Sequence, residues 1–151
     1  MTTIREQIIV ADKAIVDGVS FIKTSKRIMM KYEELKNFAL TQIPVAAVVG
    51  RLPKPEQYHR SGRRRENIDQ IQSNLIVDVF VYFQCTNVEN MDTEVSDYAN
   101  QMFAALFADG SRGGLCLETV IEIEPEYLFW DPFVAFRMKA SHLYLHDKGG
   151  I

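Results

Sequence analysis

The sequence predicts an α+β domain: one mostly antiparallel, twisted sheet of four to five strands with an N-terminal helix and a second long helix packed on it. Three observations favour this class. Helical and strand-like patterns follow one another in irregular order, alternating apolar and polar residues mark strands in the second half, and no internal repeat is present. A chain of 151 residues suits one domain, because it can bury about 70% of its surface without a disulfide or metal.

The N-terminal segment predicts a helix that ends at Gly18. Its apolar residues recur at helical spacing, and its charged residues, Asp12 among them, are expected on the opposite, solvent-facing side. A strand is expected over 21–30, a short helix over 32–40 and a buried strand over 43–49, where an unbroken apolar run precedes a glycine.

The second half contains the clearest strand, over 75–85, and a helix over 92–109 that Asp92 or Thr93 caps. Two further strands are expected over 117–124 and 133–146. The core is expected to contain Val77, Val79, Val81, Phe83, Met102, Phe103, Leu106, Ile121, Ile123, Val134 and Phe136.

The last strand changes its apolar parity. Its apolar residues are even-numbered up to Ala140 and odd-numbered at Leu143 and Leu145, which predicts a bulge near Ser141.

The segment 51–72 interrupts this pattern and predicts a long projecting basic loop or arm of the single domain 1–151. Prolines, a serine and a glycine break regular structure here, and residues 51–65 carry six basic side chains against one acidic side chain. A solvated loop is the ordinary interpretation of such a run, and a contact with protein or nucleic acid is the alternative. The candidate interface residues are Arg51, Arg60, Arg63, Arg64 and Arg65.

Composition and motifs favour no enzyme. The net charge of −3 argues against a general nucleic-acid binder, no apolar run approaches the ~20 residues of a membrane helix, and charges in the first residues argue against a secretion signal. No serine elbow or phosphate-binding loop is present. Cys85 and Cys116 both lie in apolar, strand-like runs, and Cys85 is expected to be a buried structural thiol. His142 and His146 are expected to be strand-end surface residues about 13 Å apart, too far to share a metal ion.

A row of carboxylates follows the strand over 117–124: Glu118, Glu122, Glu124 and Glu126. Paired carboxylates perform hydrolysis or hold magnesium, whereas a row along one strand face is more often solvated. We expect no catalytic residue, no metal and no cofactor, and we interpret the row as an acidic face.

The chain resembles the tail terminator (tail completion, minor tail) proteins of long-tailed bacteriophages. The resemblance covers most of the chain and consists of soft patterns. These are the N-terminal helix, the approach Ile43-Pro44-Val45 to an apolar strand, the alternating strand 76–83, the helix end 103–109, the turn Gly113-Gly114-Leu115, the glutamate-rich stretch and the final strand.

The resemblance implies a non-enzymatic virion protein at the tail end of the head–tail junction, assembled in the host cytoplasm. Members of this family form a ring of six subunits on the tail tube, stop its growth and offer a surface to the head-completion or neck protein. The implied partners are therefore the chain itself, the tail-tube protein and the neck protein, with DNA passing through the channel without specific binding and no membrane contact. The basic segment would then contact a neighbouring subunit or the tube, and the acidic row would form a complementary face or line the channel.

Alternatives remain open at this point. A head–tail connector or a tail-tube-like subunit would be a related part of the same machine. A small carboxylate-dependent hydrolase and a nucleic-acid-binding module are more remote.

Overall fold

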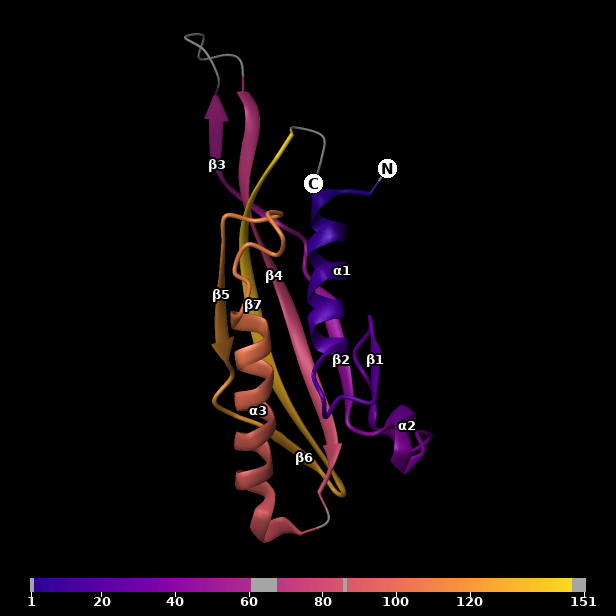
Figure 1. Cartoon of the computed structure of the whole chain (residues 1–151). Coiled ribbons are helices and arrows are strands. Elements are labelled where there is room, and N and C mark those ends of the chain that lie inside the picture. The colour runs from indigo at the N-terminus through magenta and orange to yellow at the C-terminus, as the bar shows by residue number, and fades with distance from the viewer. Residues whose placement is uncertain (1, 61–67, 86, 148–151) are drawn as a thin grey trace.

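A computed structural model describes residues 2–60, 68–85 and 87–147, and the side chains within these ranges except those of 56–60 and 68–70. The α+β prediction is confirmed, because helices pack on one open sheet (Figure 1). The described helices are α1 (Ile4–Asp17), α2 (Tyr32–Leu35) and α3 (Met91–Phe107), with 3-10 turns η1 (Leu40–Gln42) and η2 (Val88–Asn90). The strands are β1 (Thr24–Lys26), β2 (Val45–Gly50), β3 (Lys54–Arg60), β4 (Ile68–Gln84), β5 (Glu118–Ile123), β6 (Leu128–Trp130) and β7 (Phe133–His146).

The described strands form a 7-stranded sheet, which is larger than the four to five strands expected. The main order is β1-β2-β4-β7-β5, in which only β1 and β2 are parallel neighbours. β3 continues the edge of β4 beyond β2, and β6 continues the edge of β7 beyond β5. The sheet is larger than expected because two strands were missed: β6 has only three residues, too few for periodicity to reveal, and β3 contains a proline. The strand expected over 21–30 is reduced to the three residues of β1.

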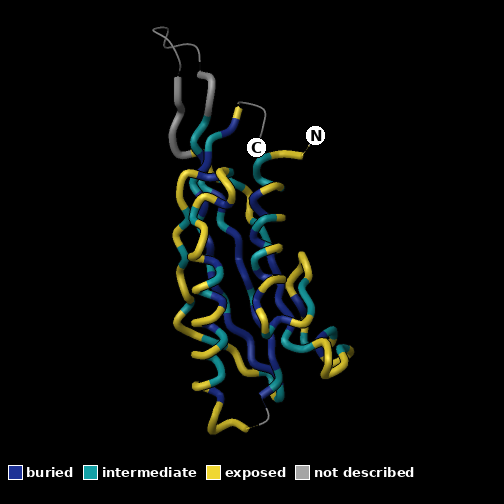
Figure 2. Tube along the Cα trace, in the orientation of Figure 1, coloured by how far each residue is buried: buried dark blue, intermediate teal, exposed yellow. Residues whose placement is uncertain are grey.

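Both long helices cover the same face of the sheet (Figure 1), and the main core lies beneath them (Figure 2). The helix α1 begins at Thr3, whose side chain accepts a hydrogen bond from the amide of Glu6. Eight of the expected core residues are buried: Val77, Val79, Val81, Phe83, Met102, Leu106, Val134 and Phe136. Phe103 and Ile121 are half-buried, and the prediction for Ile123 is wrong, because this residue is 45% exposed at the end of an edge strand.

The predicted bulge near Ser141 is also wrong. β4 and β7 pair without a register shift from Ile71–His146 to Gln84–Phe133. The even-numbered residues of β7 therefore face the helices throughout, so His142 and His146 are 0% and 2% exposed and are not surface residues. The apolar residues change from even to odd numbers because His142, Tyr144 and His146 continue the inner face. Leu143 and its odd-numbered neighbours lie half-buried on the outer face.

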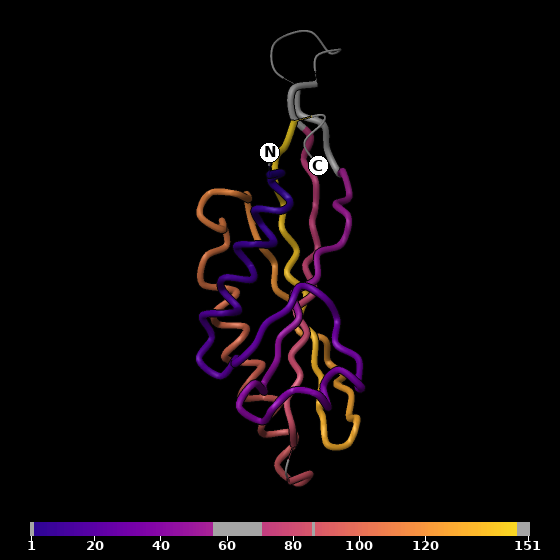
Figure 3. The backbone as a smooth tube through the Cα atoms, turned by 90° about the vertical axis from the view of Figure 1, so that its right-hand side faces the viewer, coloured from indigo at the N-terminus to yellow at the C-terminus, as the bar shows by residue number. Residues whose placement is uncertain are grey.

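The predicted long loop over 51–72 is largely a β-hairpin arm. β3 pairs with the first half of β4, from Lys54 opposite Asn74 to Arg60 opposite Ile68, and the hairpin extends beyond the helices (Figures 1 and 3). Pro55 is tolerated because β3 is an edge strand, where one side of the backbone needs no partner. Residues 61–67 lie outside the described ranges.

Candidate functional site

The two ends of the sheet are open edges of opposite charge. We call residues 23–31 the basic edge, which comprises β1 and the chain on either side of it. It contains Lys23, Lys26, Arg27 and Lys31 and no acidic residue. Arg27 binds Glu6 of α1 at 2.7 Å, whereas no ion pair is recorded within the described residues for the three lysines. An edge strand presents unpaired backbone N–H and C=O groups, so it offers another strand a place to pair.

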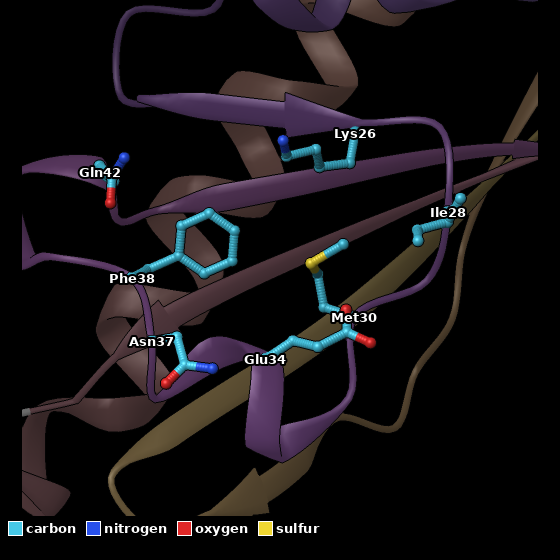
Figure 4. A pocket seen from close by; sticks show the side chains of 7 residues that line it. All are labelled: Lys26, Ile28, Met30, Glu34, Asn37, Phe38 and Gln42. Carbon is cyan, nitrogen blue, oxygen red and sulfur yellow. The ribbon is translucent and has the colours of Figure 1, made fainter.

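Apolar surface adjoins the basic edge. Ile28 and Met29 are 60% and 55% exposed. A pocket of about 460 Å³ lies beside them, lined by Lys26, Ile28, Met30, Glu34, Asn37, Phe38 and Gln42 (Figure 4). A second, of about 760 Å³, lies on the other side of Met30 and reaches Trp130 of β6. These pockets exist because β1 has only three residues and the short helix α2 packs a small separate core around Leu35.

The opposite end of the sheet is acidic. We call residues 118–130 the acidic edge, which comprises β5, β6 and the chain between them. It contains the predicted row Glu118, Glu122, Glu124 and Glu126 and no basic residue. Its exposed apolar side chains are Val120, Ile123, Leu128 and Phe129.

The four carboxylates do not converge into a site. Glu118, Glu122 and Glu126 are exposed, and Glu124 binds Arg137 at 3.0 Å. In the part of the chain that the structure describes, no three acidic, histidine or cysteine side chains are placed to hold a metal ion. This arrangement suits a charged surface that meets a partner.

The arm carries the predicted arginine cluster. Arg60 ends β3, in a stretch whose side chains are not described, and Arg63, Arg64 and Arg65 lie outside the described residues. Arg51 sits at the base of the arm, where its guanidinium binds Asp78 of β4 at 2.8 and 3.1 Å. That bond raises the pKa of Arg51 above its ordinary value, so the pair remains charged and fastens the arm to the sheet.

A buried polar network was missed in the sequence. Asp12 is fully buried on α1, where one carboxylate oxygen accepts from Arg112 Nε at 2.6 Å and the other bonds His142 Nε2 at 2.5 Å. His142 Nδ1 lies 2.8 Å from the Thr119 hydroxyl, which donates to the carbonyl of Gly110 at 2.7 Å. A hydroxyl has one hydrogen, which Thr119 gives to Gly110, so the Thr119 oxygen accepts from Nδ1.

The network connects α1 to β7, to β5 and to the turn after α3. Arg112 reaches Asp12 because its backbone is left-handed (φ 50°), and Gly113 and Gly114 follow at 70° and 89°. Asp109 holds this turn by accepting from the Ser111 hydroxyl and from the amides of Gly113 and Ser111, and these bonds, the hydroxyl's first, lower the pKa of its carboxyl. The spacing of Asp12 from Ile8, one helical turn earlier, is the signal in the sequence that would have put Asp12 on the buried face.

The remaining histidines and cysteines have structural partners. His146 Nε2 lies 2.7 Å from the Ser73 hydroxyl, so His142 and His146 share a face of β7 but bond different groups. Cys85 and Cys116 are buried free thiols, which confirms the prediction for Cys85. Burial raises the pKa of both, which keeps them protonated and poor as nucleophiles.

No protein-family model matches the sequence, and no curated protein matches it. None of the helices in the described ranges is long and apolar enough to span a membrane.

Proposed function

We propose that this protein is a structural subunit of a long-tailed bacteriophage virion. It caps the tail tube as a ring, ends tube polymerisation and provides the docking surface for the head or neck. Its partners are other copies of the chain, the tail-tube protein and a head-completion or neck protein, and its place is the tail end of the head–tail junction.

The observation that carries this proposal is the β3–β4 arm. It extends past the helices as paired strands (Figure 1), and the sequence has four arginines between residue 60, where β3 ends, and residue 65, in the segment that joins β3 to β4. A paired hairpin holds its shape, so it can place charges on a neighbouring protein at low cost in conformational entropy. The two open sheet edges offer further contact surface on the same subunit.

We assign the arm arginines to a protein contact. A conduit for DNA must let a polyanion slide, and a ring of arginines at one constriction would hold phosphates. The planar guanidinium also suits protein carboxylates, which it binds through two parallel hydrogen bonds. The arm therefore reaches the tail tube, where its contacts fix orientation more than affinity.

Tube length tests this function. Deleting the gene from the phage should give tubes of uncontrolled length that do not join heads, and supplying the protein from a plasmid should restore normal tails. Electron micrographs of the lysate measure both. Tubes of normal length joined to heads in the deletion strain would contradict the proposal.

The same experiment separates the related alternatives. Loss of a head–tail connector leaves tails of normal length beside unjoined heads, and loss of a tail-tube-like subunit leaves no tubes. A carboxylate-dependent hydrolase or a nucleic-acid-binding module predicts neither result.

A further inference from the structure

We infer that the basic edge of one copy pairs with the acidic edge of the next, so that the sheets of neighbouring subunits join edge to edge. The inference rests on the proposed function only for closure of the ring. The pairing itself follows from strand directions, charge and exposed apolar surface.

Strand directions permit the pairing. β1 is parallel to β2, and each later step along the order β2-β4-β7-β5 is antiparallel. β1 and β5 therefore run in opposite directions. A second copy added in the plane of the sheet presents its β5–β6 edge antiparallel to β1, which is the more favourable pairing for short strands.

The register indicates which residues meet. Thr24 of β1 aligns across the sheet with Val45, Tyr82 and Ala135, and finally with Leu128 of β6. Lys26 aligns across the sheet in the same way, with Arg137 of β7 as the last residue of its row. The carbonyl of Arg137 accepts a hydrogen bond from the amide of Glu124, so Glu124 lies at the edge of that row. A copy added without a step along the strands thus faces β1 with residues 124–128, which are the connection between β5 and β6 and the first residue of β6.

Charge selects this arrangement over symmetric ones. Residues 23–31 carry four basic and no acidic side chains, and residues 118–130 carry four acidic and no basic side chains. A two-fold dimer through either edge would bring like charges together, which is unfavourable across neighbouring strands. Pairing the two different edges matches opposite charges, and such head-to-tail contacts produce rings when the rotation between copies closes.

Apolar surface on both edges would be buried at the same time. Ile28, which follows β1, is 60% exposed, and Leu128 and Phe129 of β6 are 56% and 42% exposed. The pocket between β1 and α2, which Met30 and Phe38 line (Figure 4), lies beside β1 and offers room for an apolar side chain of the partner edge. The acidic row is thereby assigned to the contact between subunits, which leaves the arm for the tail tube.

Disulfide trapping tests the pairing. A chain with both Lys26→Cys and Glu126→Cys, oxidised at high protein concentration, should give a ladder of covalent dimers, trimers and higher species on a non-reducing gel. Each single variant should give at least several-fold less dimer, and a mixture of the two single variants should stop at dimers. The native thiols are buried and stay out of the reaction. A matched control carries Glu89→Cys and Gln101→Cys, which are exposed and lie outside residues 23–31 and 118–130, and should give no ladder.

Charge reversal provides the second measurement. The cysteines are now placed at Thr24 and Leu128, which the register sets in one row. In copies with this cysteine pair, Lys23→Glu with Lys26→Glu should abolish the ladder. Adding copies that carry the same cysteines with Glu122→Lys and Glu126→Lys, the exposed glutamates on either side of residue 124, should restore it. Absence of the ladder, abundant dimers of one single variant, or no recovery in the doubly reversed mixture would overturn the inference. If the disulfide ladder forms but the deletion strain has normal tails, the proposed function alone is contradicted. If the plasmid-borne protein restores normal tails but no disulfide ladder forms, the edge pairing alone is contradicted.

Discussion

At the scale of single residues, Asp12 is the side chain that joins the two other charged or titratable groups of the buried polar network. Its carboxylate is the shared acceptor of Arg112 and His142, and all three side chains are fully buried. Buried ion pairs add little net stability when complete, but removing one partner leaves an uncompensated charge in the core. Asp12 was predicted on the solvent side because charge was given more weight than its helical spacing.

The substitution Asp12→Asn should therefore lower the free energy of unfolding by about 3–5 kcal/mol. The amide fits the same space, yet its nitrogen turns a donor toward Arg112 or His142. Urea unfolding measures the change.

The matched control is Asp17→Asn on the same helix, whose partner Lys13 lies 3.1 Å away at the surface. Loss of that exposed pair should cost about 1 kcal/mol or less. Equal losses in the two variants would show that the network does not hold α1 to the sheet.

At the scale of elements, α3 shows what hydrophobic periodicity predicts about a helix and what it does not. The pattern located the helix and its buried side, but the predicted cap is wrong, because Asn90 and neither Asp92 nor Thr93 precedes the first residue of α3. The pattern also ranked Met102 and Phe103 as equal core residues. Met102 is fully buried, whereas Phe103 lies at the margin of the core and stacks on Phe107 with ring centroids 5.6 Å apart.

Met102→Ala should cost about 2–5 kcal/mol, as for other fully buried large side chains, and Phe103→Ala should cost less although it removes a larger group. Thermal unfolding of the two variants under one set of conditions gives the order. A larger loss at Phe103 would place the core closer to that face of α3 than the structure does.

The arm is the element whose role is best tested by charge. Replacing Arg60, Arg63, Arg64 and Arg65 by Ser should leave the unfolding midpoint within a degree or two of the parent, because the helices and the core lie away from the end of the arm. Attachment to the tail tube should weaken, most visibly at high salt, where the remaining ionic contacts are screened.

Co-sedimentation with purified tubes at two salt concentrations measures that attachment. The control replaces Lys13 and Lys36, which are surface cations on other elements, and should bind tubes normally. Normal binding of the arginine variant at both salt concentrations would remove the arm from the tube contact.

At the scale of the whole molecule, the fold class followed from the order of patterns, because long elements with one buried face leave a clear periodicity. The features missed were those whose cause lies in tertiary contacts. β3 was predicted as a loop because its proline argues against a strand, and the sequence does not show that this strand lies at an edge, where proline is tolerated. The inner face of β7 was assigned wrongly beyond Ala140 because histidines and a tyrosine, and not aliphatic residues, continue it. The charged segments were predicted, but their places at opposite ends of one sheet required the strand order.

The most direct test of the central proposal is a symmetric reconstruction of the neck of the virion that contains this chain. We predict six copies of the 17.3 kDa subunit in one ring on the head-proximal end of the tail tube, with the arm against the tube and the two sheet edges in contact between neighbours. A single copy, or a position away from the neck and the tail end, would contradict the account.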